Sequence, residues 1–288
     1  MSQVSDYKSS PFDLNVQPAA PSNYTGTATP PGPGYTGTGL NGVPDYSYDS
    51  LCGVKFSTTD GRTVAIVRNA ATALSVGVMV QEPAEVTAFE KMAITVPTAT
   101  PATAGTYQIL VTNGATKINV NQFQGGYLVV ASGTGKGQTL QIAGNQNAVA
   151  STGKFLVTLQ DAIQTTLDAT STVSLIANPY TNVIIAPSSE TGAPLGVTAF
   201  AIAASVLPTF DGTTGAQTAT GTPVYGFIVT HGPVGCLVDT LTNVGYPVGR
   251  SASVAGAVSV ATLTTAAAVG TSMQTQTDTQ VGLIYLNL

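Results

Sequence analysis

From residue 51 onward, the chain alternates short runs of β-branched, aliphatic and aromatic residues with clusters of Gly, Asn, Pro and Ser. Runs of this kind at a spacing of roughly 8–12 residues are typical of sandwiches and barrels. The runs predicted to be strands are 64–70, 93–97, 107–112, 117–121, 127–132, 140–144, 154–160, 173–177, 182–186, 225–230, 236–240 and 281–288. Short helices are expected at most over 70–78 and 156–167. The sequence therefore predicts a mainly β fold made of β-sandwich or barrel-like modules.

Three pairs of similar segments suggest that these β-modules are duplicated. The pairs keep the same order along the chain, and they are Val86–Phe89 with Val197–Phe200, Tyr107–Gly114 with Tyr225–Gly232, and Gly126–Val129 with Gly245–Val248. A period this long does not suit a solenoid and indicates two related domains or two halves of one double-sheet body. We therefore predict one module over 51–150 and a second over 151–288. The alternative is coincidence in a chain rich in Thr, Ala and Val.

Residues 1–50 differ in composition from the rest of the chain. They hold seven of the 17 prolines and five of the 11 tyrosines, and they contain the tetrapeptide YTGT twice. Stretches rich in Pro and Gly favour extended chain over a packed core. The segment is then either a disordered tail or an extended arm that orders on a neighbouring subunit. Tyrosine is a preferred contact residue, so the second interpretation makes Tyr24, Tyr35, Tyr46 and Tyr48 candidate partner-binding residues.

Charged side chains are scarce. Asp, Glu, Lys and Arg make up 8% of the residues, against roughly 25% in an ordinary soluble domain. The net charge is −5, and the nine basic residues are scattered. Nucleic-acid binding is not expected, because following a phosphate backbone requires clustered Lys and Arg. Proton transfer and metal binding also draw on charged or imidazole side chains. The composition thus predicts a protein without enzymatic activity, metal or cofactor.

One glycine-rich segment, 132–139 (SGTGKGQT), invites comparison with a phosphate-binding loop. A Walker motif requires Ser or Thr directly after its lysine, whereas Lys136 is followed by Gly137. Val130 also occupies the position of the first glycine of that motif. Because the segment lies between two predicted strands, we predict a hairpin turn without nucleotide binding.

His231 is the only histidine and lies in the tetrapeptide THGP, which predicts a turn between two strands. Asp239 follows eight residues later, and the chain has no nucleophile motif such as GxSxG. A catalytic triad is therefore not expected. The segment DGTTG, which begins at Asp211, is also predicted to be a turn, because it lacks the other oxygen ligands of a calcium loop.

Glu82, Glu85 and Glu90 form the densest acidic group in the chain. Carboxylates so close together could bind Ca²⁺ or act as a glycosidase pair. Arg68 and Lys91 lie near them in sequence, so we predict solvated ion pairs on a loop instead. No catalytic or metal-binding residue is assigned.

The two cysteines, Cys52 and Cys236, are far apart in sequence and belong to no CxxC pair. Buried free thiols are expected, and a disulfide between them remains the alternative. The longest apolar stretch, 196–207, is interrupted by Thr and Ser and is too short for the roughly 20 residues of a spanning helix. The first ten residues lack a basic segment followed by a hydrophobic one, so neither a membrane span nor a secretory leader is expected.

Residues 125–288 carry a loose pattern of strands and turns. Its parts are 133–145, 154–161 and 174–185, then 225–239 with its "GP" and "LVD" elements, 248–251, and a small-residue segment ending in 281–286. The pattern resembles head-associated structural proteins of tailed bacteriophages, of the decoration or cement class. The motifs are structural in type, and the N-terminal arm is not part of the pattern.

This resemblance implies a non-enzymatic, β-rich protein that forms a homotrimer and binds the major capsid protein where capsid subunits meet. The location implied is the capsid exterior of a virion, after synthesis in the host cytoplasm. Contacts made by apolar burial and by Thr, Gln and Asn are insensitive to salt, which suits an uncharged assembly protein. The main alternative is a tail, baseplate or host-recognition protein of the virion that binds host carbohydrate. A cell-surface coat protein and an enzyme are further alternatives.

Overall fold

The computed structural model describes residue 49 and residues 51–96, 102–150, 153–241, 243–261, 267–277 and 280–288. These residues form strands β1 to β19 and the short 3-10 helix η2 (Thr87–Phe89). The predicted mainly β fold is confirmed. The predicted arm, 1–50, with Tyr24, Tyr35, Tyr46 and Tyr48, lies outside the described residues apart from Asp49. Nowhere in the described part of the chain is there a helix with the length and apolar character needed to span a membrane.

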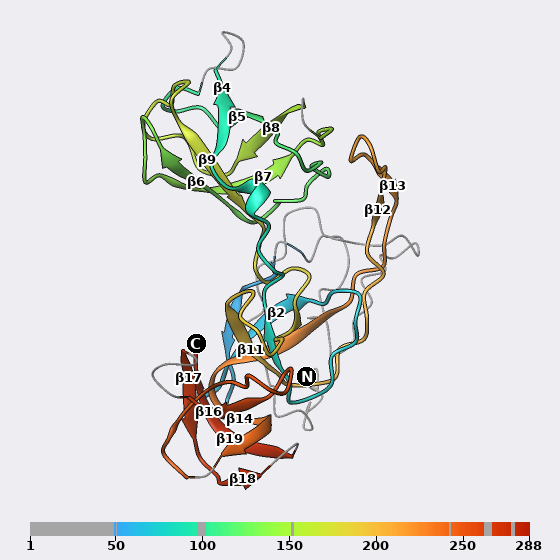
Figure 1. The fold of residues 1–288 in the computed structure, drawn as a ribbon, viewed down its shortest axis with the longest axis vertical. Coiled ribbons are helices and arrows are strands. Elements are labelled where there is room, and N and C mark those ends of the chain that lie inside the picture. Colours follow the sequence, from blue (N-terminus) through green and yellow to red (C-terminus); the bar gives the residue numbers. More distant parts are fainter. Residues whose placement is uncertain are drawn as a thin grey trace, which may run out of the picture.

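Six antiparallel strands close into a barrel at one end of the molecule (Figure 1). They are β4 (Met92–Thr95), β5 (Gln108–Thr112), β6 (Tyr127–Ser132), β7 (Thr139–Asn145), β8 (Lys154–Leu159) and β9 (Thr172–Ile176). Around the barrel the order is β4, β5, β8, β7, β6, β9, and β9 returns to β4. In β8 buried Phe155, Val157 and Leu159 alternate with residues that face outward. This period of two fills the barrel with its own apolar core.

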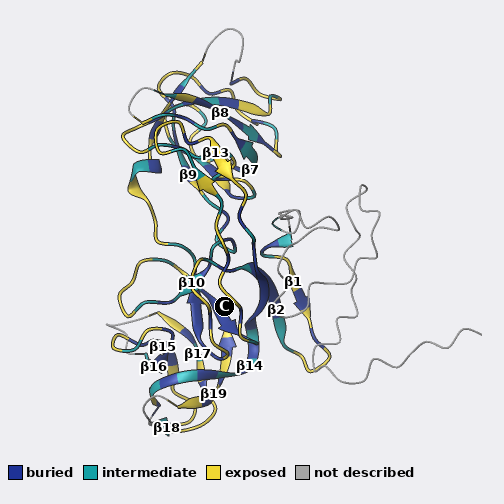
Figure 2. Cartoon of the chain, turned by 90° about the vertical axis from the view of Figure 1, so that its right-hand side faces the viewer, coloured by how far each residue is buried: buried dark blue, intermediate teal, exposed yellow. Residues whose placement is uncertain are grey.

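The second body, here called the base, is an eleven-stranded sheet. Its strands are β1 (Lys55–Ser57), β2 (Thr63–Arg68), β3 (Met79–Gln81), β10 (Ile184–Ile185), β11 (Pro194–Thr198), β14 (Tyr225–Leu241), β15 (Pro247–Arg250), β16 (Val258–Val260), β17 (Ala268–Ser272), β18 (Gln276–Thr277) and β19 (Val281–Asn287). Two apolar clusters, separate from the barrel core, stabilise it. Figure 2 shows buried residues concentrated in the barrel and in the base.

The long strand β14 organises the base. Its first half pairs with β2 and β11, and its second half pairs with β19, β16 and β18. From β16 the pairing continues through β15 and β17 to β19, which returns to β14. The second half of β14 therefore belongs to a closed ring of strands, while the first half belongs to an open sheet.

The barrel is inserted into the base. Strands β3 and β10 are antiparallel neighbours, with Ile184 opposite Gln81, and the whole barrel lies in the connection between them. Closely spaced ends are what allow one domain to be inserted into another. The strands thus group differently from the predicted modules 51–150 and 151–288. The reason is the pairing of β8 with β5 and β7, which places residues after 150 in the barrel.

The segments predicted to be duplicated do not occupy equivalent positions. Val86–Phe89 leads into and forms η2, whereas its counterpart 197–200 begins at the end of β11. Tyr107–Gly114 contains β5 of the closed barrel, whereas Tyr225–Gly232 starts β14 of the base. One body is a six-stranded barrel and the other is an eleven-stranded sheet of which only one part closes into a ring, so their topologies differ.

Both suggested helices are absent. Residues 70–78 form turns and an isolated bridge, and residues 156–159 complete β8. Leu156 is paired with Leu110 on the neighbouring barrel strand β5. Burial of alternate side chains against a neighbouring strand overrides the weak helical spacing of this segment.

A separate hairpin connects the two bodies (Figure 1). Strands β12 (Thr209–Phe210) and β13 (Gln217–Ala219) extend from the base alongside the barrel. The turn DGTTG is confirmed, since Asp211 Oδ1 accepts a hydrogen bond of 3.0 Å from the Thr213 amide. From this turn the Asp211 carbonyl accepts from Lys117 Nζ at 3.0 Å, and the Gly215 carbonyl accepts from the Val120 amide at 3.2 Å. The hairpin therefore holds the barrel against the base at a second place.

Candidate functional site

The only histidine lies inside β14, so the turn predicted at His231 is wrong. The strand has a bulge between Val229 and His231, and Gly232 has a φ of 100°. A bulge accommodates a left-handed glycine and a following proline without ending the strand. The imidazole packs edge-to-face on Tyr285, with 5.3 Å between ring centroids. Asp239, further along the same extended strand, is roughly 26 Å away, so the two residues cannot act as a pair.

The predicted hairpin turn at 132–139 is confirmed, because β6 and β7 are antiparallel neighbours. Positive φ angles at Gly133, Gly135 and Gly137 give the turn its shape. Thr134 Oγ1 donates a hydrogen bond of 2.5 Å to Asp168, and this bond lowers the pKa of that carboxyl group. The chain enters β7 directly after the turn, whereas a phosphate-binding loop leads into a helix.

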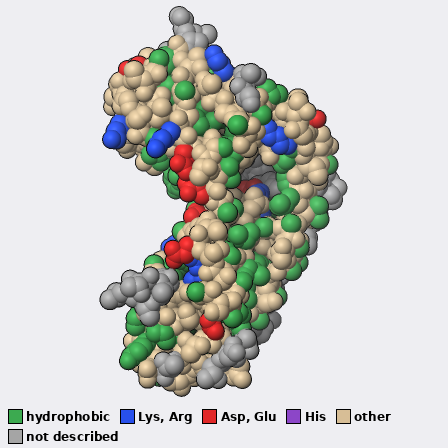
Figure 3. All heavy atoms as spheres, in the orientation of Figure 1, with side chains coloured by type: hydrophobic (Ala, Val, Ile, Leu, Met, Phe, Trp, Pro, Cys, Tyr) green, Lys and Arg blue, Asp and Glu red, His purple; other side chains and the backbone are tan. Residues whose placement is uncertain are grey.

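The acidic group belongs to the connection between barrel and base. In Figure 3 acidic side chains gather at the hollowed waist of the molecule. Within the described residues, Glu82, Glu85 and Glu90 take part in no ion pair. Glu82 Oε1 instead accepts a hydrogen bond of 2.9 Å from the Ala193 amide. The predicted ion pair with Arg68 is wrong, because Arg68 pairs with Asp49. Among the described side chains, no cluster of His, Cys, Asp and Glu could hold a metal ion.

Both cysteines are buried free thiols, as expected. Burial raises the pKa of the Cys236 thiol from 9.0 to about 12, and burial also raises the pKa of Cys52. A thiol acts as a nucleophile only as the thiolate. At neutral pH both side chains therefore serve as small apolar core residues.

Asp49, the described residue that follows the N-terminal segment, is held by a partly buried polar network. Its carboxylate forms an ion pair with Arg68 and accepts a hydrogen bond of 2.8 Å from Tyr225 Oη. Arg68 Nη2 also donates to Asn182 Oδ1 at 3.0 Å. Burial, followed by the charge of Asp49, raises the pKa of Tyr225, so its hydroxyl stays protonated and keeps donating. The network thus fixes the position of Asp49 on the base.

An apolar surface lies on the outward side of β14 and β19. We call it the outer face, and it consists of Pro233, Leu237, Met273, Val281, Leu283 and Tyr285. Pro233 is directly opposite Tyr285, and Leu237 is opposite Val281. Directly opposite residues of antiparallel strands lie on the same side of the sheet. Met273 is the next residue after β17, and its amide donates to the Leu283 carbonyl at 3.0 Å.

The outer face is exposed although it is apolar. Val281 is 56% exposed, Tyr285 40% and Leu283 38%, and residues 231–237 and 281–287 carry no formal charge. Contiguous apolar surface of this kind marks an interaction site in soluble proteins. The sequence contained a signal for it, because in VGLIYLNL the residues of both faces of the strand are apolar.

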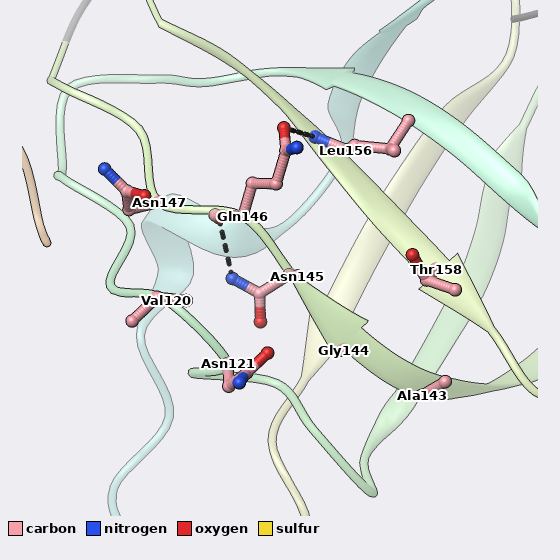
Figure 4. A pocket seen from close by; sticks show the side chains of 9 residues that line it. All are labelled: Val120, Asn121, Ala143, Gly144, Asn145, Gln146, Asn147, Leu156 and Thr158. Atoms are coloured by element: carbon pink, nitrogen blue, oxygen red, sulfur yellow. Dashed lines mark hydrogen bonds between the residues drawn. The ribbon is translucent and has the colours of Figure 1, made fainter. Parts of the chain in front are cut away.

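A pocket of about 410 Å³, with apolar as well as polar lining groups, opens on the barrel surface between β7, β8, the connection that joins them and the loop before β6 (Figure 4). It is lined by Val120, Asn121, Ala143, Gly144, Asn145, Gln146, Asn147, Leu156 and Thr158. β7 bulges between Ile142 and Gly144, which bends the strand away from a regular ladder. A Cβ at Gly144 would lie 2.9 Å from Asn121 Oδ1, so glycine keeps this space open.

The rim of the pocket is fixed by Asn145, which is buried and fully hydrogen-bonded. Its Oδ1 accepts from the Phe123 amide at 2.9 Å. Its Nδ2 donates to the carbonyls of Asn119 and Gln146, each at 2.9 Å. These bonds hold the loop against the end of β7, so the pocket has a defined shape without a ligand.

The pocket could not be predicted from the sequence. Its lining residues lie in separate loops and strands, and the sequence does not show that these segments meet. No protein-family model, curated protein or solved structure matches the chain. The features of this chain that bear on its function are therefore the outer face, the polar network at Asp49 and the pocket.

Proposed function

We propose that the protein is a non-enzymatic structural protein of a virion, which decorates or cements the capsid exterior through contacts between subunits. The observation that carries the proposal is the outer face, an exposed apolar surface without formal charge. Such a surface supports association that is insensitive to salt, because the hydrophobic effect is not screened by ions. The partners proposed are further copies of this chain, as a homotrimer, and the major capsid protein.

The occupant proposed for the outer face is the N-terminal segment of a neighbouring copy. That segment leaves the base at Asp49, whose side chain is held by Arg68 and Tyr225. At roughly 3.1 Å per residue in extended polyproline II, its 48 residues span about 150 Å, which is ample reach for a neighbouring subunit. Its prolines and tyrosines suit an apolar, uncharged surface, and proline limits the entropy lost on ordering.

The location is tested on particles of the virus that encodes the chain. We expect quantitative mass spectrometry of separated heads and tails to find the protein in heads, at a fixed ratio to the major capsid protein. Recovery in tails alone would favour the alternative, a tail, baseplate or host-recognition protein, for which the amide-lined pocket is the supporting observation. Absence from both fractions would contradict a role in the virion.

The assembly mode is tested by placing a charge on the outer face. We expect Leu283→Lys, and separately removal of residues 1–48, to shift the purified protein from trimer toward monomer in sedimentation-velocity experiments. Burying an unpaired ammonium group in an apolar contact is strongly unfavourable. Ile176→Lys is the matched control, because Ile176 is 46% exposed on the barrel strand β9 and lies outside the face.

The two variants separate the parts of this proposal. If Leu283→Lys leaves the trimer intact while the truncation dissociates it, the N-terminal segment binds elsewhere on its neighbour. If both variants stay trimeric, the outer face is not the contact between copies. If Ile176→Lys dissociates the trimer as readily, the effect of lysine is not specific to the outer face.

A further inference from the structure

We infer that the barrel pocket binds a neutral polyhydroxylated ligand, with the chemistry of a sugar unit. The inference rests on the lining residues shown in Figure 4 and does not depend on where the protein sits in a virion. Neither the apolar outer face nor the buried Asp49 network contributes to this pocket, which lies on the barrel.

The lining selects against charged ligands. None of the nine lining residues is Asp, Glu, Lys, Arg or His. An ion entering the pocket would lose water without gaining a counter-charge, which is unfavourable. The volume of about 410 Å³ is within the range of small-molecule sites, roughly 300–1,000 Å³.

The lining also offers polar groups that the protein itself does not use. Among the described residues, the side-chain amide of Asn121 and the hydroxyl of Thr158 have no hydrogen-bond partner. Gln146 Oε1 accepts a long bond of 3.4 Å from the Leu156 amide, and its Nε2 donates to none of the described residues. Figure 4 shows Asn121 and Thr158 near Gly144, and the Gln146 side chain directed toward the Leu156 amide.

Two amides and a hydroxyl provide both donors and acceptors in the lining of one pocket. A ligand with adjacent hydroxyl groups complements this lining, because each hydroxyl group can both donate and accept a hydrogen bond. Sugars carry hydroxyl groups in this arrangement. An apolar ligand would leave the amides unpaired and is disfavoured for that reason.

The pocket is preorganised. Asn121 is held at a φ of 53°, a left-handed conformation that costs energy for a residue other than glycine. Its backbone amide donates to the Asn145 carbonyl at 2.9 Å, which keeps the side chain at the pocket. Elsewhere on the rim, Asn147 Nδ2 donates to the Thr214 carbonyl of the β12–β13 turn at 2.9 Å. Rigid placement of polar groups reduces the entropy lost when a ligand binds.

The test is saturation-transfer NMR on the full-length protein. The probes are glucose, galactose and N-acetylglucosamine, oligosaccharides containing them, and glucuronic acid as the charged comparison. We expect transfer to at least one neutral sugar, with shifts of the side-chain amide signals of Asn121 and Gln146. If free monosaccharides bind, a single soluble sugar unit is enough to fill the pocket. If only oligosaccharides bind, the ligand is a sugar unit within a polysaccharide.

Matched variants assign the binding to the pocket. Gly144→Ala moves the Asn121 amide, and Thr158→Val removes one hydroxyl at nearly constant shape; each is expected to weaken binding about tenfold. Gly114→Ala is the control, because Gly114 lies outside the pocket and a Cβ there would meet only the Ala88 carbonyl oxygen, at 3.8 Å. The melting temperature of each variant verifies folding. The inference is overturned if no neutral sugar binds, if glucuronic acid binds as well as glucose, or if Gly144→Ala and Thr158→Val both bind like Gly114→Ala.

Discussion

Ile109→Ala is expected to lower the stability of the barrel, and Ile228→Ala that of the base, each by about 2–5 kcal/mol. Both isoleucines are fully buried, Ile109 in the barrel core and Ile228 in a core of the base. The two variants therefore make the same truncation of an isoleucine side chain in two separate apolar cores. Differential scanning calorimetry should resolve two transitions, of which each variant shifts a different one.

The conservative variants Ile109→Val and Ile228→Val serve as controls, with expected losses of about 1 kcal/mol each. If calorimetry instead shows a single transition that either alanine variant shifts, barrel and base unfold as one cooperative unit. In that case the contacts of the β12–β13 turn with the barrel would couple the two bodies more strongly than their separate cores suggest.

Arg68→Met is expected to destabilise the base by about 3 kcal/mol, because it leaves the carboxylate of Asp49 without its counter-charge. The side chain of Arg68 is 11% exposed and that of Asp49 is 21% exposed, so solvent screens this pair only weakly. Urea denaturation measures the loss. Hydrogen exchange of the Cys52 amide, which donates to the Asp49 carbonyl at 3.1 Å, should accelerate as well.

Arg62→Met provides the matched control. Arg62 pairs with Asp60, which is 41% exposed, and exposed pairs contribute about 0–1 kcal/mol. The double variant Asp49→Asn with Arg68→Met should regain part of the stability, because it removes the uncompensated charge. If Arg68→Met costs no more than Arg62→Met, the network at Asp49 does not anchor the N-terminal segment energetically.

The strands of the barrel were predictable because their local pattern agrees with their final environment. In β5 and β8 apolar residues alternate with exposed ones, and both strands form the barrel wall. The pairing of β3 with β10 was not predictable, since it joins two short strands separated by an entire barrel. Local propensity says nothing about which strands meet across so long a connection, and the division at residue 150 therefore misplaced β8.

The same dependence on long-range contacts decides which features of the candidate sites could be predicted from the sequence. At Gly232 and Pro233 the sequence has the composition of a turn, but the bulge keeps both residues inside β14. The outer face was within reach of sequence reasoning, because β19 is apolar on both sides. The pocket was not, because Asn121 and Thr158 come together only when the loop folds over the barrel wall.

The continuity of β14 has a mechanical consequence. Because its hydrogen bonds to neighbouring strands run across the strand axis, a pull along that axis loads them in shear, all at once, rather than peeling them one after another. Its first half is bonded to β2 and β11, and its second half to β19 and β16. A single strand thus carries tension from one end of the base to the other, and neither half can yield without straining the other.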